Sequence, residues 1–314
     1  MVFFWYCKKN KGNERTFGGS MTDLTIGIDG GGSSCRAAVT DATGRILGRG
    51  TAGPSNILSD LDTSLLNIVA SAKNALSDAG LSPETVLSVA AVIGVAGANV
   101  GDYAERIERA LPFARRRVVT DATTALQGAL GDADGVIGAF GTGSVYNARR
   151  NGKLYGIGGW GFIVGDQASG ARLGRDLLEQ SLLAHDGVRP SSPVTQTVMA
   201  EYGDDPERLV EFAHVSRPND FARYAPVVFE AAAKGDPVAT AIVLNAAASI
   251  GESLDALLWP ECEAICLLGG LAKAYRPWLA ERHAALLREP KGDVLQGAID
   301  LAVKFLREEG TGAA

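Results

Sequence analysis

Two glycine-rich segments, Asp29-Gly30-Gly31-Gly32-Ser33-Ser34 and Gly141-Thr142-Gly143-Ser144, each follow a short apolar run. Glycine at a strand end lets the backbone approach a ligand closely and point successive N–H groups at it, which suits phosphate oxygens. The adjoining hydroxyls add hydrogen bonds, and the Asp29 carboxylate could hold a Mg²⁺-bound water. One such loop is explained equally well by a tight hairpin turn. Two loops at equivalent places in a repeated pattern favour phosphate binding.

Neither segment has the sequence of a Walker A loop or of a dinucleotide-binding fingerprint, and both lead into a strand rather than a helix. The pattern therefore excludes the two commonest nucleotide folds. It favours a clamp formed by two lobes.

Two carboxylates and an amide could act on a sugar. Asp121 follows the run Arg117-Val118-Val119-Thr120 and begins a predicted helix. It is either a general base for a sugar hydroxyl or the N-cap of that helix. Asn56 lies on the loop that leaves a strand, where it could bind a sugar hydroxyl or form an ordinary Asn turn.

A third candidate region is the glycine-studded loop Gly158 to Gln167, which contains Gly159, Trp160 and Asp166. Exposed backbone beside an aromatic face suits the mixed polar and apolar surface of a sugar. Asp166 precedes a predicted helix, so a capping role is open for it too.

The elements that must position these residues alternate between strand and helix. Apolar runs predict strands at 24–29, 35–40, 45–50, 89–95 and 117–120, with helices at about 61–79, 102–110 and 122–130. The order strand, glycine loop, strand, turn, strand restarts about 112 residues later, with strands at 136–140, 145–149 and 153–157. Helices follow at about 168–184, 191–202, 206–213, 220–234 and 236–258, and then a strand at 264–268 that ends in Gly269-Gly270.

This repeat predicts an α/β protein of two similar lobes with the glycine loops at strand ends, where open α/β sheets bind ligands. We expect an N-terminal lobe at 21–131 and a C-terminal lobe with a helical insertion at 132–293. A final amphipathic helix at about 294–308 is expected to pack back on the first lobe. Residues 1–20 precede Met21 and the first strand, and are interpreted as a disordered leader or a start-site artefact.

Composition limits the partners. The net charge of −6 argues against a nucleic-acid or anionic-membrane surface, and no run beyond the short apolar start of the chain approaches the length of a membrane span. The four cysteines have no disulfide or zinc spacing, which fits a reducing cytoplasm. The sequence leaves the oligomeric state open, a homodimer included.

Together these segments resemble the bacterial glucosamine kinase and N-acetylglucosamine kinase group, within the BadF/BadG/BcrA/BcrD-type ATPases of the actin and sugar-kinase superfamily. The resemblance extends in order through residues 24–300 and rests on segments 27–36, 53–56, 120–122, 141–144, 165–170, 232–237 and 265–270. It implies a duplicated actin-like (ribonuclease H-like) ATPase fold, with a nucleotide cleft between the lobes.

The resemblance also implies a role for each candidate residue, with ATP and Mg²⁺ as cofactors and a small-molecule amino sugar as the acceptor. Asp29 would hold Mg²⁺ through water, and both glycine loops would hold the ATP phosphates. Gly235-Asp236 and Gly269-Gly270 would flank the adenosine. Asp121 would be the catalytic base that also contacts the sugar. The remaining sugar ligands would be Asn56, Asp166 and, from the same loop, Gly159.

Two departures from the family pattern bear on the substrate. Ser33 stands where the family often has Thr, and keeps the hydroxyl. Val145 stands where animal N-acetylglucosamine kinases carry a sugar-binding Asn. The segments 35–36, 186–190 and 265–268 look closer to the bacterial glucosamine kinases. The resemblance therefore favours glucosamine as the expected substrate, with N-acetylglucosamine as the alternative.

Two other classes are weighed against a kinase. An activator ATPase of an acyl-CoA dehydratase would need paired cysteines for an iron–sulfur cluster near the nucleotide, and Cys262 and Cys266 lie at or within a predicted strand. A sensing regulator is disfavoured by the acidic chain and by the presence of both candidate carboxylates.

Overall fold

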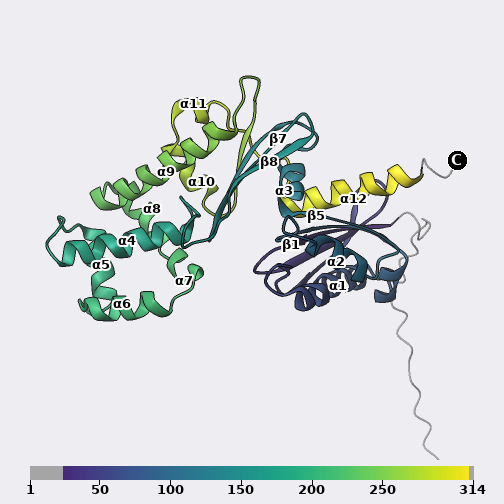
Figure 1. Ribbon diagram of the computed structural model, residues 1–314, viewed down its shortest axis with the longest axis horizontal. Helices are drawn as coiled ribbons and strands as arrows, with labels where there is room; N and C mark the ends of the chain where they lie inside the picture. Colours follow the sequence, from purple (N-terminus) through teal and green to yellow (C-terminus); the bar gives the residue numbers. More distant parts are fainter. Residues whose placement is uncertain (1–23, 311–314) are drawn as a thin grey trace, which may run out of the picture. The chain divides into compact units, whose positions relative to one another are not determined.

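The computed structural model describes residues 24–310, so the predicted leader lies outside the described residues. Within this range the chain forms two compact units, one of residues 24–124 with 294–310, and one of residues 125–293 (Figure 1). The boundary lies inside helix α3 (Asp121–Leu130), whereas the sequence pattern placed it after the helix. The second half of α3 shares a hydrophobic cluster with the second unit, formed by Leu126, Ala129, Leu130, Ile137 and Cys266.

The first unit is built on a five-stranded sheet of order β3-β2-β1-β4-β5. Its first three strands, β1 (Thr25–Gly30), β2 (Cys35–Thr40) and β3 (Ile46–Ala52), form an antiparallel meander, as the sequence predicts. The last two, β4 (Ala90–Val95) and β5 (Arg115–Thr120), run parallel to β1. The carboxyl ends of β1, β4 and β5 therefore meet at one edge of the sheet.

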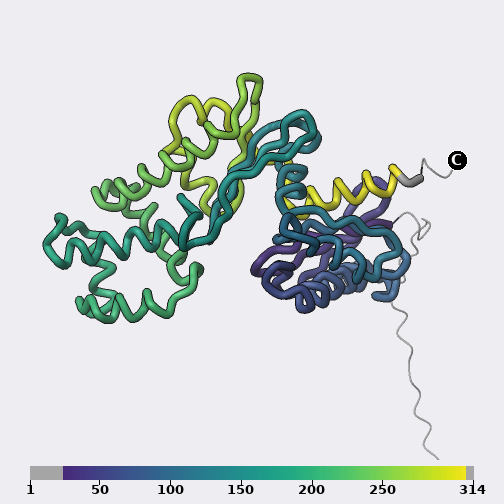
Figure 2. The backbone as a smooth tube through the Cα atoms, viewed as in Figure 1, coloured from purple at the N-terminus to yellow at the C-terminus, as the bar shows by residue number. Residues whose placement is uncertain are grey.

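Both faces of this sheet are covered, because alternate side chains of each strand point to opposite faces. Ala37 and Val39 share a cluster with residues of α1 (Leu61–Asp78), whereas Ala38 packs with residues of α12 (Val294–Gly310). Helix α12 contacts β1 and β4, and Figure 2 shows this yellow segment beside the purple and blue residues of the first unit. A 3₁₀ helix, η2 (Pro83–Leu87), and α2 (Tyr103–Ala110) complete the unit.

The second unit repeats this arrangement in a four-stranded sheet of order β8-β7-β6-β9. Strands β6 (Gly135–Phe140), β7 (Ser144–Arg150) and β8 (Lys153–Gly158) form a second antiparallel meander, and β9 (Ile265–Leu268) is parallel to β6. The predicted repeat is confirmed, since each glycine loop connects the first two strands of its meander.

The remaining helices of the second unit surround its larger core. They are α4 (Gly170–His185), α5 (Pro193–Glu201), α6 (Pro206–Val215), α7 (Pro218–Ala222), α8 (Ala225–Ala233), α9 (Pro237–Leu257), α10 (Ala272–Tyr275), the 3₁₀ helix η3 (Arg276–Trp278) and α11 (Glu281–Ala284). The helix predicted at 220–234 is two helices, because Pro226 stands in the first turn of α8, where its missing N–H is tolerated.

Helix α9 is long and apolar enough, by length and composition alone, to cross a membrane. No other helix in the described range meets that test. Its buried residues, among them Ile242, Val243 and Ile250, belong to the core of the second unit. The packing of α9 is therefore that of a core helix.

Candidate functional site: two glycine loops and their carboxylates

The first glycine loop joins β1 to β2, with the Gly31 N–H donating to the Ser34 carbonyl over 3.0 Å. A two-residue hairpin turn of the usual kind needs a positive φ, yet Gly30, Gly31 and Gly32 all lack one. A side chain at Gly32 would meet nothing within 4 Å. Packing requires Gly30, where a Cβ would lie 2.7 Å from both Ser55 Oγ and Val95 Cγ1. Neither turn geometry nor packing requires Gly31 or Gly32, so the open backbone there favours close approach of a ligand over a plain turn.

Asp29 forms an ion pair that the sequence reasoning missed. It lies opposite Arg36 in the β1–β2 register, and the Nε and Nη2 atoms of Arg36 donate to Asp29 Oδ2 over 3.1 and 2.6 Å. Counting back equally from both ends of the hairpin loop would have found this pair. The loop therefore has a carboxylate and a guanidinium side by side at its base.

The Asp29 carboxylate fits a Mg²⁺ site of a particular kind. The described residues contain no group of three or more acidic, His or Cys side chains that could enclose a metal. Mg²⁺ in phosphoryl-transfer sites is commonly held by one or two carboxylates together with substrate phosphates and water. A single carboxylate beside a glycine loop that could hold phosphate matches that pattern.

Asp121 is at the same sheet edge as Asp29. In the parallel register Asp29 is level with Gly94 of β4, and Gly94 with Val119 of β5. Asp121 comes two residues after Val119 and begins α3. Its side chain is solvent-exposed, but the surrounding protein still raises the pKa of its carboxyl, and the negative charge of Asp29 raises it further.

The N-cap of α3 is Thr120 rather than Asp121. The Thr120 hydroxyl accepts the Thr123 N–H over 3.2 Å, which is the bond an N-cap makes. Asp121 instead occupies the first helical position, where its Oδ1 accepts the neighbouring Ala122 N–H over 2.9 Å. The capping interpretation is therefore wrong for Asp121, and its carboxylate is placed for other use.

Asn56 forms an Asn turn and also lies at the sheet edge that holds Asp29 and Asp121. Its Oδ1 accepts the Leu58 N–H over 3.0 Å, and the next residue, Ile57, donates its N–H to Ala96 just beyond β4. An added Cβ at Gly97 would lie 3.1 Å from Asn56 Oδ1. The first unit thus gathers Asp29, Asp121 and Asn56 at one end of its parallel strands.

The second glycine loop is held against the start of α4. Gly170 and Ala171 donate their N–H groups to the carbonyls of Gly141 and Thr142 over 2.8 and 3.2 Å. The Ser144 hydroxyl donates to the Gln167 carbonyl over 2.6 Å. Thr142 donates its hydroxyl to Asn219 Oδ1 over 2.6 Å, a contact that no sequence pattern indicated.

Gly269 adjoins this loop from β9. Its φ of +87° and a virtual Cβ only 2.3 Å from the Phe140 carbonyl oxygen show that only glycine fits there. Leu271 donates its N–H to the same carbonyl over 3.2 Å. The structure therefore brings Gly269-Gly270 directly beside Gly141.

Asp166 lies in the same cluster and is not a helix cap. Ser169 takes that role for α4 by accepting the Arg172 N–H over 3.2 Å. Asp166 is buried, with a φ of +56°, and a Cβ at Gly143 would lie 2.8 Å from its Oδ2. Burial raises the pKa of the Asp166 carboxyl, while N–H donors, the Gly161 amide first, oppose that shift.

The loop before Asp166 supplies the other sugar candidates. Gly159 donates its N–H to the Ser144 carbonyl over 3.1 Å, so this glycine lies beside the second glycine loop. Trp160 follows and is 78% exposed. The second unit thus gathers Gly141 to Ser144, Gly159, Asp166 and Gly269-Gly270.

Asp236 has a structural task. Its Oδ1 accepts the Val238 and Ala239 N–H groups at the start of α9, each over 3.0 Å, and its Oδ2 accepts the Val194 N–H of α5 over 3.0 Å. Burial alone would raise the pKa of this carboxyl, but those N–H donors outweigh it and lower the pKa. The hydrogen bonds of Gly235 and Asp236 stay within α5, α8 and α9.

Comparisons with known proteins agree with this arrangement. A model of the BadF/BadG/BcrA/BcrD ATPase family matches residues 26–302. The glucosamine kinase GspK of Vibrio cholerae is 35% identical over 280 residues, which cover 89% of this chain and 95% of that protein.

Solved structures give the same picture. A presumed N-acetylglucosamine kinase from Chromobacterium violaceum superposes with a TM-score of 0.82 at 33% identity, covering 90% of this chain and 100% of the other. A ROK family glucokinase from Streptomyces griseus shares the fold, with a TM-score of 0.51 at 20% identity and coverage of 90% and 99%. The fold is the two-lobe, actin-like fold of sugar kinases, and the chain belongs to the BadF/BadG/BcrA/BcrD ATPase family.

Proposed function

We propose that this protein transfers the γ-phosphoryl group of ATP to the 6-hydroxyl of glucosamine. The observation that carries the proposal is the placement of Asp121 at the same sheet edge as the first glycine loop and Asp29. Its carboxylate does not serve as the N-cap of α3 and has a raised pKa. Similarity to a glucosamine kinase over nearly its whole length supports the choice of sugar.

In this proposal Asp121 takes the proton from the sugar hydroxyl as the oxygen attacks the γ-phosphorus. The bond from that phosphorus to the bridging oxygen breaks, ADP leaves with the electron pair, and the proton passes to solvent. A raised pKa makes the carboxylate a stronger proton acceptor than an ordinary Asp. Most of the remaining rate enhancement in phosphoryl transfer comes from positioning and charge neutralisation.

Backbone N–H groups of both glycine loops would hold the phosphates, and Gly269-Gly270 would border the nucleotide. Asp29 would hold Mg²⁺ through water, and the bound metal would neutralise charge on the phosphates. Arg36 lies beside that carboxylate and adds positive charge to the same place. For Gly235-Asp236 we propose approach of the adenosine to the backbone alone, because the Asp236 carboxylate is engaged as a cap.

The sugar would bind to Asn56 from the first unit and to Gly159 and Asp166 from the second. Within the described residues no group accepts a hydrogen bond from the side-chain NH₂ of Asn56, so this donor is available to a hydroxyl. N-acetylglucosamine is the second candidate substrate, because the Chromobacterium structure, which superposes well on this chain, is described as that of an N-acetylglucosamine kinase.

The alternative as an iron–sulfur activator finds little support in the cysteines. Cys266 lies inside β9 and packs against α3, and Cys262 is buried with its thiol directed at the Ala264 carbonyl. Cys35 is a buried thiol beside the Ser71 hydroxyl. These three are free thiols, and we propose a cytoplasmic location, where ATP and reducing conditions are found.

The experiment is a coupled assay of ADP release with glucosamine, N-acetylglucosamine, N-acetylmannosamine and glucose. We expect sugar-dependent release that is fastest with glucosamine, and loss of at least about a hundredfold in kcat for Asp121→Asn with ATP binding retained. Asp62→Asn is the matched control, because Asp62 is likewise an exposed acid in the first turn of a helix of the first unit. Failure with all four sugars, or turnover by Asp121→Asn near the wild-type rate, would reject the proposal.

A further inference from the structure

The hydroxyl groups of the second glycine loop are already used as donors within the protein. Thr142 donates its hydroxyl to Asn219 Oδ1 over 2.6 Å, and Ser144 donates its hydroxyl to the Gln167 carbonyl over 2.6 Å. A hydroxyl has one hydrogen to donate. The segment Gly141 to Ser144 also contains no Lys or Arg. A phosphate at this loop would therefore find backbone N–H groups but no further donor on the loop's own side chains.

Helix α7 supplies a side-chain donor next to the loop. Asn219 of α7 is exposed, and within the described residues no group accepts a hydrogen bond from its side-chain NH₂. This nitrogen carries two hydrogens to donate. Because the amide nitrogen and oxygen are bonded to the same carbon, these hydrogens lie close to the Thr142 hydroxyl that the oxygen accepts. The contact thus exchanges one hydroxyl hydrogen for two amide hydrogens at the loop.

Helix α7 is held close to the loop by two glycines of α4. A Cβ added at Gly174 would lie 1.9 Å from the Phe221 carbonyl oxygen, so only glycine lets α7 approach α4 this closely. A Cβ at Gly170 would lie 3.1 Å from the Gly141 carbonyl oxygen and 3.2 Å from Ala222 Cβ. Figure 1 shows α7 beside α4 in the second unit. The start of α4 therefore contacts both the glycine loop and the end of α7.

Aromatic packing fixes α7 from its other side. Phe221 is 5% exposed, and its ring centroid lies 5.0 Å from that of Phe162 and 5.9 Å from that of Phe212. All of these residues, with Thr142 and Asn219, belong to the second unit. Asn219 is therefore held in place before a ligand arrives, which reduces the entropy lost on binding.

We propose that Asn219 is a nucleotide ligand, whose Nδ2 donates to a phosphate oxygen of the nucleoside di- or triphosphate at the second glycine loop. Its Oδ1 meanwhile holds the Thr142 hydroxyl. The inference rests on the part of the proposed function that places the phosphates of ATP at this loop. A hydrogen bond from a neutral donor to a charged group contributes a factor of about 10 or more in affinity.

The test is direct titration of ATP and of ADP, each with Mg²⁺ and without sugar, into wild type, Asn219→Asp and Asn219→Ala. Asn219→Asp keeps an oxygen for the Thr142 hydroxyl, but replaces the NH₂ donor with a negatively charged oxygen. We expect Kd for both nucleotides to rise by about tenfold in Asn219→Ala and by about 100-fold in Asn219→Asp. Asn245→Asp is the matched control, since Asn245 is an exposed asparagine of α9 in the same unit, and its Kd should equal that of wild type.

The order of the two variants separates a ligand from a residue that only holds Thr142. If Asn219 only held that hydroxyl, Asn219→Asp would bind nucleotide like wild type and Asn219→Ala would bind more weakly. Either result would overturn the inference. If Asn219→Asp does not fold, Asn219→Ala is compared in the Thr142→Val background, where the hydroxyl is gone. A tenfold rise in Kd there supports a ligand, and an unchanged Kd overturns it.

These titrations need no sugar, so they are independent of the proposed reaction. The expected Kd values in a protein that phosphorylates no sugar would reject the kinase function and leave the inference about Asn219 standing. A kinase whose Asn219→Asp variant binds ATP like wild type would do the reverse. A wild-type protein that binds neither nucleotide would reject both.

Discussion

The substitution Gly269→Ala should distort the second glycine loop, Gly141 to Ser144, which we propose binds phosphate. Gly269 has a φ of +87°, and its added Cβ would lie 2.3 Å from the Phe140 oxygen and 2.8 Å from the Phe140 carbonyl carbon. These are backbone atoms of β6, which pairs with β9 up to the preceding residues Ala139 and Leu268. They cannot rotate away as a side chain can, so the two strand ends must separate.

The cost has two parts. A left-handed backbone with a Cβ costs about 1–2 kcal/mol, and forcing one methyl group into close-packed atoms costs about 1–3 kcal/mol. We therefore expect the free energy of unfolding to fall by about 2–5 kcal/mol. Because Phe140 leads directly into Gly141, the phosphate loop should move as well, and loss of one or two of its hydrogen bonds would raise KM for ATP by about tenfold.

Urea unfolding followed by tryptophan fluorescence measures the first effect, since Trp160, Trp259 and Trp278, three of the four tryptophans, lie in the second unit. The control is Gly270→Ala, where an added Cβ meets nothing within 4 Å and φ is not positive. Its stability should stay within about 0.5 kcal/mol of wild type. Equal stability of the two variants would refute the reasoning.

Four other outcomes follow from single contacts. Arg36→Met should raise KM for ATP by about tenfold by removing a cation beside the first phosphate loop, with Arg36→Lys recovering part of it; equal KM values in all three proteins would contradict this. Gly143→Ala places a Cβ 2.8 Å from Asp166 Oδ2, which should displace this proposed sugar ligand and raise KM for the sugar. An unchanged sugar KM in steady-state kinetics would argue against contact between Asp166 and the sugar. The raised pKa of Asp121 predicts that kcat/KM is lost as pH is lowered, because the base becomes protonated, with a midpoint above the ordinary Asp value of about 4. The Asp62→Asn variant, measured as a reference, should show the same midpoint. Hydrogen bonds from its basic neighbours, Arg282 first, lower the pKa of Asp255 to about 2. Stability from this depressed carboxyl is present above about pH 4 and lost as pH falls towards 2, so Asp255→Asn, 46% exposed in the wild type, should cost about 1 kcal/mol at pH 7 and nearly nothing at pH 2 by urea titration.

The amino-acid sequence determined the order of elements and the two loops. Period-two and continuous apolar runs marked the strands, and the glycine clusters at their ends marked where backbone could meet phosphate, because both signals are local. The same local signal placed Asp121 and Asp166 before helices. It could not decide whether either was a cap, since that depends on which of several neighbouring oxygens reaches the free N–H groups.

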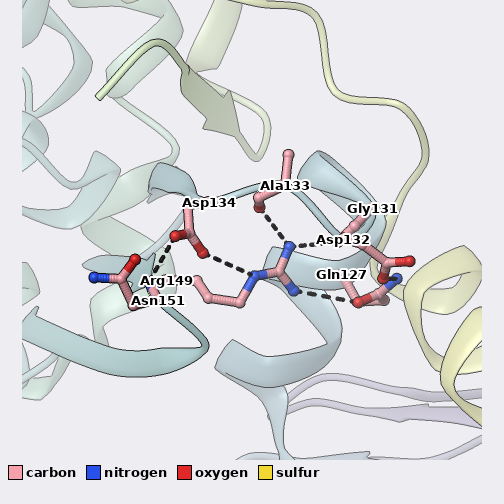
Figure 3. Close-up of polar contacts among 7 residues, drawn as sticks. All are labelled: Gln127, Gly131, Asp132, Ala133, Asp134, Arg149 and Asn151. Carbon is pink, nitrogen blue, oxygen red and sulfur yellow. Dashed lines mark hydrogen bonds and ion pairs between the residues drawn. The ribbon is translucent and has the colours of Figure 1, made fainter. Parts of the chain in front are cut away.

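Tertiary structure decided those questions. Thr120 and Ser169 are the N-caps of α3 and α4, which leaves the carboxylates of Asp121 and Asp166 for other use. The Asp236 carboxylate, in contrast, accepts N–H groups at the starts of both α5 and α9. The pairing of Arg36 with Asp29, and the hydrogen bond from Arg149 of β7 to Gln127 of α3 (Figure 3), join residues of different strands and helices. Such contacts depend on register and on the packing of distant segments, and these are fixed only when the sheets form.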